Sequence, residues 1–229
     1  MKFILKWILR ILLLLIVIAA AAGYFARETL LETAGHFLAP RGDYKADAVI
    51  LEGADYIRTG FIDEGLDLLK AGKVRRVIVV IHRIAPAHRP FGINGDYPDI
   101  VREKLKAKGL KDSDFQVIVA PIRSPVTLQE ARFVLQELAG HADKIHTAIL
   151  VAPGFHTRRS YLAYAHVGEP LSIRIFPSAS FTNYTLDHWW TDKAAVREFC
   201  AESVKLFYYL AFGHIPFKFS YSGTEKEAL

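Results

Sequence analysis

Short apolar runs alternate along this chain with segments in which apolar residues recur at helical spacing. The apolar run 48–51 comes first, and the β-branched run 77–81 follows it. Between them lie Ile62, Leu66 and Leu69, spaced i, i+4 and i+7. Apolar runs bounded by turn residues are typical of strands buried on both faces, and the spacing between them predicts an amphipathic helix. The stretch therefore predicts a strand, a helix and a second, parallel strand.

The same alternation continues towards the end of the chain. Further strands are predicted at 116–120, 147–152 and 171–176, and further helices at 99–108, at 128–139, from 156 onward and at 192–212. Strands that alternate with helices form a parallel sheet with helices on both faces. The expected fold class is therefore α/β, with a Rossmann-like, doubly wound, mostly parallel sheet of about five strands.

Ligands of such folds bind beyond the carboxyl ends of the strands, where the strand order reverses. With the first strand central, the reversal is expected between the first and fourth strands. The segments 52–59, 121–127 and 153–159 then share one edge of the sheet. We expect the imidazole of His156 to face the turn after the first strand across a cavity.

The N-terminal segment predicts the cellular compartment in which the domain lies. Residues 11–26 carry no charge and follow Lys2, Lys6 and Arg10. These residues span about 24 Å as a helix, and snorkelling by Lys6 and Arg10 extends their reach towards the roughly 30 Å of the hydrocarbon layer. Because the cationic side stays in the cytoplasm, we expect a single-pass anchor in the inner (plasma) membrane and a domain in the periplasm or an equivalent extracytoplasmic space.

A cleavable signal peptide is the alternative, because residues 20–22 fit an A-x-A cleavage site. A retained anchor is favoured, because Trp7 and Tyr24 flank the segment and 27–40 can continue as a membrane-proximal helix. The expected division is an anchor or signal (1–26), a membrane-proximal linker (27–45), a Rossmann-like domain (46–214) and a C-terminal tail (215–229).

Composition excludes several classes of protein. The net charge is +5 and the pI is near 9.2, but the basic residues are dispersed, so no nucleic-acid partner is expected. His82 and His88 lack a third ligand, so no metal site is expected, and no particular cofactor can be named. The single cysteine, Cys200, excludes an intrachain disulfide and is expected to be a small buried residue of the last helix.

The segments 52–59 and 121–127 contain candidate ligand-binding residues, each of which also has a purely structural interpretation. Around Gly53, backbone amides near a helix start suit an anion, although a plain turn is equally compatible. Asp55 suits a hydroxyl or cation, or it caps the turn. Thr127 and Glu130 have the spacing of a helix capping box, and that role is compatible with facing a ligand.

In the third segment, His156, Arg158 and Arg159 lie on a first helical turn. Cations there oppose the helix dipole, so the arginine pair indicates an anionic ligand, with solvated surface arginines as the alternative. His156 has an ordinary pKa near working pH, so it is a candidate general acid or base.

Several features occur in a characteristic order. They are the run 46–51, the helix ending 68–72, the T-x-x-E-A of Thr127 to Ala131, the H-x-x-R of His156 and Arg159, the pair Trp189 and Trp190, and the helix ending 202–213. In this order they resemble the YdcF-like family of envelope proteins, which includes SanA and ElyC. The resemblance covers residues 47–213.

The resemblance implies a Rossmann-like domain that is tethered to the bacterial inner membrane and linked to envelope integrity and peptidoglycan metabolism. It marks as pocket candidates Gly53, Thr127, Glu130, His156, Arg159 and Glu202. The sequence departs from the family where Glu52, Ala54 and Asp55 replace small residues, which limits how closely a phosphate can approach the backbone.

Two functional hypotheses follow. In the first, the pocket binds an anionic, phosphate-containing small molecule or lipid-linked precursor, with His156 and Glu130 as catalytic residues. Its ligand-binding residues are then Gly53, Asp55, Thr127, Arg159 and Glu202. In the second, the domain is a non-catalytic envelope scaffold or sensor. Binding of an adenosyl cofactor is a third possibility. The Rossmann-like fold favours it, but an extracytoplasmic location does not.

Overall fold

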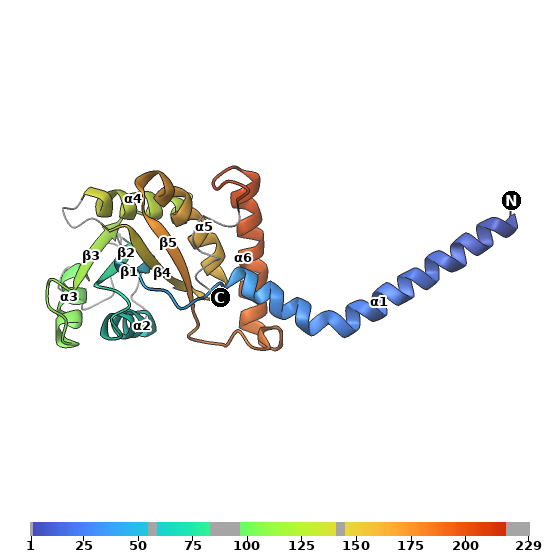
Figure 1. The fold of residues 1–229 in the computed structure, drawn as a ribbon, viewed down its shortest axis with the longest axis horizontal. Coiled ribbons are helices and arrows are strands. Elements are labelled where there is room, and N and C mark those ends of the chain that lie inside the picture. Colours follow the sequence, from blue (N-terminus) through green and yellow to red (C-terminus); the bar gives the residue numbers. More distant parts are fainter. Residues whose placement is uncertain (1, 55–58, 83–96, 141–144, 219–229) are drawn as a thin grey trace.

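The computed structural model describes residues 2–54, 59–82, 97–140 and 145–218 (Figure 1). The strands found there are β1 (Ala48–Ala54), β2 (Arg76–His82), β3 (Phe115–Ala120), β4 (Thr147–Pro153) and β5 (Arg174–Ser180). The helices are α1 (Lys2–Leu38), α2 (Thr59–Lys70), α3 (Tyr97–Ala107), α4 (Val126–Gly140), α5 (Thr157–Gly168) and α6 (Lys193–Ala211). Short 3₁₀ turns at Gly154–His156, Glu169–Leu171 and Trp189–Thr191 complete the described elements.

The five strands form one sheet in the order β3-β2-β1-β4-β5, and every pairing is parallel. The order runs outward from β1 in both directions, so it reverses between β1 and β4. Helices lie on both faces of the sheet (Figure 1). The predicted α/β class, the doubly wound topology and the position of the reversal are confirmed.

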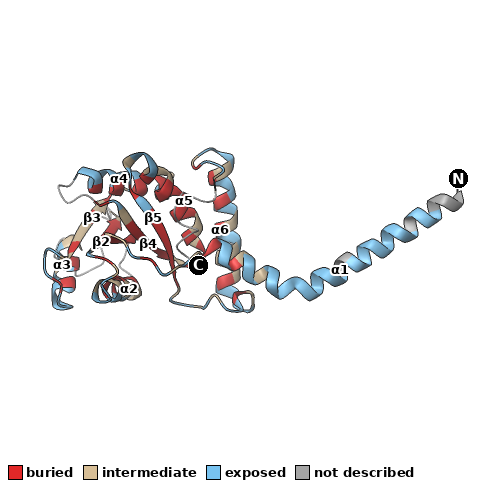
Figure 2. Cartoon of the chain, viewed as in Figure 1, coloured by how far each residue is buried: buried red, intermediate tan, exposed pale blue. Residues whose placement is uncertain are grey.

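Burial on both faces explains why the strands are uninterrupted apolar runs. Val49 and Leu51 of β1 pack on the side of α2 and α3, whereas Ala48 and Ile50 pack with α4 and α5 on the other side. Successive residues of a strand point to opposite faces, so a strand covered on both sides needs apolar residues at every position. Figure 2 shows this core as buried strands between partly buried helices.

Strand β1 continues beyond the position where the sequence predicted a turn. Glu52, Gly53 and Ala54 belong to the strand, and its pairing with β2 shifts register between Leu51 and Ala54. Such an irregularity redirects the side chains next to it. The sheet itself, rather than a loop, therefore holds Glu52 and Gly53 in place.

Helix α1 runs without interruption from Lys2 to Leu38, so it also covers much of the predicted linker. Its part from Lys6 onward is long and apolar enough to cross a membrane (Figure 1). The last turns pack on the domain, where Trp189 donates a hydrogen bond from Nε1 to the carbonyl oxygen of Leu31 at 2.9 Å. A Cβ on Gly35 would lie 2.6 Å from the same Nε1 atom, so glycine allows this close approach.

Helix α6 begins at Asp192, whose carboxylate accepts hydrogen bonds from two backbone N–H groups of the first turn. Trp189 is buried, with its ring centroid 5.2 Å from that of Phe155 and 4.2 Å from that of Phe199. The ring of Trp189 therefore packs between α6 and the core of the domain. Cys200 is exposed, so its predicted burial is wrong.

Leu150 lies in the middle of β4 and is fully buried. We expect Leu150→Ala to lower the free energy of unfolding by about 2–5 kcal/mol, because it leaves a cavity in the core. Ile122 is 51 % exposed, so Ile122→Ala is a matched control with an expected change of roughly 0.5 kcal/mol or less. Thermal unfolding of the full chain in mild detergent measures both, and equal shifts would contradict the assigned burial.

Candidate functional site

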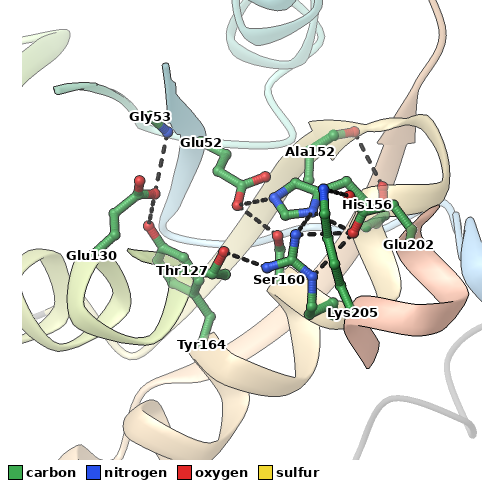
Figure 3. A network of polar contacts seen from close by, with 12 residues as sticks. Glu52, Gly53, Thr127, Glu130, Ala152, His156, Ser160, Tyr164, Glu202 and Lys205 are labelled. Carbon is green, nitrogen blue, oxygen red and sulfur yellow. Dashed lines mark hydrogen bonds and ion pairs between the residues drawn. The ribbon is translucent and has the colours of Figure 1, made fainter. Parts of the chain in front are cut away.

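Polar side chains from four parts of the chain converge beyond the carboxyl ends of β1 and β4 (Figure 3). They come from β1, from α4, from the turn into α5 and from α6. The cavity that they line has a volume of about 570 Å³. Glu52, Thr127 and His156 lie in its wall, so the structure brings together members of all three segments that the sequence placed at this edge.

His156 lies at the centre of the cluster, between two carboxylates. Its Nε2 is 2.9 Å from Oε1 of Glu52, and its Nδ1 is 3.1 Å from Oε2 of Glu202. Burial lowers the pKa of His156 and the nearby Arg159 guanidinium opposes its charge, but Glu52 and Glu202 outweigh both and raise the pKa to about 9. The imidazole is therefore protonated at neutral pH, with a carboxylate acceptor for each N–H.

One contact of this cluster opposes the protonation of His156. Nη2 of Arg159 lies 2.6 Å from Nδ1 of His156, and an N–H can point at Nδ1 only when Nδ1 carries no proton. We assign the charged imidazole because Arg159 and Lys205 both contact Glu202, so a neutral His156 would leave the buried carboxylate of Glu52 without a cationic partner among the described residues. Nη2 of Arg159 then donates to Oε2 of Glu202, 2.9 Å away.

Arg159 of α5 forms hydrogen bonds to residues of α6 and α4. Its Nε and Nη2 donate to Oε2 of Glu202 at 3.0 and 2.9 Å, and its Nη1 donates to Oγ1 of Thr127 at 2.7 Å. The guanidinium also lies over the ring of Tyr209, 5.0 Å from its centroid. In this arrangement the predicted anion-binding arginine already holds a carboxylate of the protein itself.

The neighbouring Arg158 contacts a different helix, α1. Its Nε donates to the carbonyl oxygen of Phe37 at 2.5 Å, and its guanidinium lies over the Phe37 ring. A cation at the C-terminal end of a helix interacts favourably with the helix dipole, and here that helix is α1. Both arginines of the pair therefore have internal partners, which removes the pair as evidence for an anionic ligand.

Glu202 remains ionised at the base of the cluster. Burial raises the pKa of this carboxyl, but the hydrogen bond and charge of His156, together with Arg159 and Lys205, hold it well below its usual range. Lys205 reaches Oε1 of Glu202 with its Nζ at 2.8 Å. Figure 3 shows the Lys205 side chain lying across the front of the cluster.

A second carboxylate and imidazole pair lies in the same wall. Oε2 of Glu130 is 2.6 Å from Nε2 of His82, and Oε1 accepts hydrogen bonds from the hydroxyl of Tyr164 at 2.7 Å and from the backbone N–H of Gly53 at 3.2 Å. Both oxygens of Glu130 are thus used by the site. Helix α4 begins at Val126, so Thr127 lies inside the helix, and the interpretation of Thr127 and Glu130 as a capping box is wrong.

Gly53 lies against this second pair. A Cβ at this position would lie 2.6 Å from Oε2 of Glu130 and 2.9 Å from Nε2 of His82. The backbone amide that the sequence offered to an anion is therefore used by a carboxylate of the protein. Asp55, the other candidate of this turn, lies outside the described residues.

Sequence reasoning missed several members of the site, among them Glu52, His82, Ser160, Tyr164 and Lys205. Helical spacing could have found two of them, because His156, Ser160 and Tyr164 are four residues apart and share one face of α5. Ser160 donates to Oε1 of Glu52 at 2.5 Å. The remaining oxygen of Glu52, Oε2, is buried and has no hydrogen-bond partner among the described residues.

Two cations of the cluster are more exposed than its carboxylates, whereas the side chain of Arg159 is only 8 % exposed. The carboxylate side chains of Glu52, Glu130 and Glu202 are 5, 3 and 7 % exposed. The side chains of His156 and Lys205 are 17 and 55 % exposed. A molecule that enters the cavity therefore meets the imidazolium of His156 and the ammonium of Lys205 before it meets these three carboxylates. The half-buried Glu198 also lines the cavity.

Within the described parts of the chain, no group of three or more His, Cys, Asp or Glu residues is arranged to hold a metal ion. No family model matches the chain, and no curated protein matches it either. The resemblance to the YdcF-like family therefore rests on the ordered motifs alone.

The raised pKa of His156 predicts how stability depends on pH. Because the folded value of about 9 exceeds the ordinary 6.5, the stabilisation is complete below about pH 6.5 and is lost as the pH rises through 9. We expect the wild type to lose on the order of 2–3 kcal/mol over this interval relative to His156→Gln. Unfolding temperatures of both proteins across this pH range measure the difference, and parallel curves would contradict the assignment.

The packing of Gly53 predicts a second effect. We expect Gly53→Ala to lower the unfolding temperature, because the added Cβ displaces the carboxylate of Glu130 from His82 and leaves polar groups unpaired, at a cost of about 1–3 kcal/mol. Gly140 is the matched control, since a Cβ there meets no atom within 4 Å. Gly140→Ala should leave the unfolding temperature unchanged or raise it, and a similar loss in both variants would count against the role of Gly53.

Proposed function

We propose that this chain is a membrane-anchored, extracytoplasmic protein of the YdcF/SanA/ElyC-like family that acts in cell-envelope metabolism. Its cavity binds an anionic, phosphate-containing ligand, such as a peptidoglycan or lipid-linked precursor. The observation that carries the proposal is the arrangement of charge, in which the cations His156 and Lys205 are more exposed to the cavity than the carboxylates of Glu52, Glu130 and Glu202.

The anchor is supported by α1 and its flanking charges. The helix is long and apolar enough to cross a membrane, and its exposed surface is apolar from Ile11 to Ile18. Lys6 and Arg10 precede this stretch, and cations next to a spanning helix remain on the cytoplasmic side. The α/β domain follows the helix and lies on the other side.

The mode of anion binding differs from the one expected from the sequence. Arg159 is hydrogen-bonded to Glu202, and the backbone N–H of Gly53 is hydrogen-bonded to Glu130. Both donors therefore hold carboxylates of the protein in place. The groups that meet the ligand are the ammonium of Lys205, which has N–H groups beyond the one donated to Glu202, and the imidazolium of His156, whose Nε2–H exchanges Glu52 for a ligand oxygen. Both are charged donors, and phosphate oxygens are acceptors that such donors bind strongly.

The same geometry suits proton transfer to a phosphate ester. In hydrolysis, a water oxygen bonds to phosphorus while the bond to the leaving oxygen breaks. The leaving oxygen replaces Glu52 as the acceptor of the Nε2–H of His156 and takes that proton, and the attacking water loses a proton to the carboxylate of Glu52. Glu52 and Glu202 keep His156 charged and oriented for this step.

A non-catalytic scaffold or sensor is the second candidate, and one observation favours it. Each charged group around His156 has an internal partner, which is what a purely structural network requires. An adenosyl cofactor fits less well. The space next to Gly53, where the backbone has to approach such a ligand closely, is filled by Glu130 and His82.

Calorimetric titration of the purified full chain with farnesyl pyrophosphate tests ligand binding. We expect His156→Gln to weaken binding about tenfold or more, because a charge-assisted hydrogen bond contributes about 1.5–3 kcal/mol. His146 is the matched control, because it is exposed next to the opposite end of β4, so His146→Gln should bind like the wild type.

Absence of binding, or equal binding by both variants, would remove the support for a phosphate ligand. Release of inorganic phosphate by the wild type but not by His156→Gln would establish catalysis. Full envelope function of a double variant, His156→Ala with Glu130→Ala, would favour the scaffold instead.

A further inference from the structure

Helix α6 is apolar on two sides, although only one of them faces the core. Leu206 and Tyr209 are buried against the domain. On the opposite side lie Cys200, Val204, Phe207, Tyr208 and, just after the helix, Phe212, which together we call the outer face of α6. A helix at the surface of a protein in water normally presents polar residues on its outer side.

The outer face holds four of the large apolar side chains that are exposed on the described part of the domain, and Phe217 follows shortly after it. Apart from α1, the described residues include nine such side chains, and five of them lie between Val204 and Phe217. Val204 and Phe207 are each 69 % exposed, and Phe212 is 68 % exposed. Contiguous apolar surface of this kind marks a site of contact with a membrane or another protein.

The position of α1 identifies the membrane as the partner. Trp189, which packs on α6 through Phe199, fixes α1 by its hydrogen bond to Leu31. Arg27 is the first charged residue after the apolar stretch, and it precedes Leu31 by four residues, or about 6 Å of helix. A rigid spacer of roughly one helical turn therefore joins the membrane surface to the domain.

The outer face of α6 lies on the side of the domain from which α1 leaves. In Figure 1, α6 forms the edge of the domain nearest the extended part of α1, and it runs crosswise to that helix. Figure 2 shows that the side of α6 turned towards this extended part is exposed. A helix crosswise to a spanning segment lies along the membrane plane, where aromatic side chains are favoured.

We propose that the outer face of α6 rests on the outer surface of the membrane that α1 crosses, with Phe207, Tyr208 and Phe212 in the interfacial layer. This inference rests on the proposed anchor but not on the proposed ligand. The surface and the cavity adjoin each other, because Lys205, Tyr208 and Tyr209 of α6 also line the cavity. The cavity thereby opens at the lipid surface, within reach of the headgroup of a lipid-linked ligand.

The single native cysteine allows a direct test. Cys200 is exposed on the outer face of α6, so a bimane fluorophore can be attached there in the full chain within lipid nanodiscs. We expect a blue-shifted emission and strong quenching by lipids that carry a doxyl group in the upper acyl chain. Cys200→Ser with Lys104→Cys is the matched control, because Lys104 is exposed on α3 and should show neither effect.

A second variant ties the effect to the aromatic residues. Phe207→Asp should reduce the quenching of a label on Cys200, whereas His156→Gln should leave it unchanged, because ligand binding is a separate property. Quenching at Cys200 no greater than at Lys104→Cys, with α1 shown to be inserted by carbonate extraction, would overturn the inference alone. Disulfide cross-linking between the Cys200 residues of two copies would also overturn it, because a second copy would then cover the surface.

Discussion

The site depends on one charged group, the imidazolium of His156, held between Glu52 and Glu202. Two carboxylates buried this close together repel each other unless a cation separates them. His156 and Arg159 supply that positive charge, and in doing so they join the end of β1, the start of α5 and the middle of α6. The same contacts that neutralise the cluster therefore also fix the elements that form the cavity.

The sequence was sufficient to predict the fold. The run at 77–81 and its counterparts had the length and apolar character of strands buried on both faces, and the helices between them required parallel pairing. The position of the site followed, because the reversal of strand order between β1 and β4 is a property of topology. What periodicity could not show was the continuation of β1 through Glu52 and Gly53, since neither residue is a strong strand former.

The roles of individual side chains were harder to predict, because they depend on partners that are distant in sequence. Arg158 and Arg159 looked like one anion site, yet one binds α1 and the other binds α6. Glu52 looked like a departure from a family pattern, yet it is the acceptor for His156. Cys200 was expected in the core because its helix is apolar, and only the packing of α6 shows which side faces outward.

The most direct test of this account is the pKa of His156, measured by NMR titration of the full chain with labelled histidine and assigned with His156→Gln. The account predicts a midpoint near 9, and a lower midpoint when Glu52 is replaced by Gln, because one of the two flanking negative charges is then removed. A midpoint at or below the ordinary value of 6.5 would show that His156 is neutral in the folded protein, and would contradict both the charge assignment and the proton-donor role.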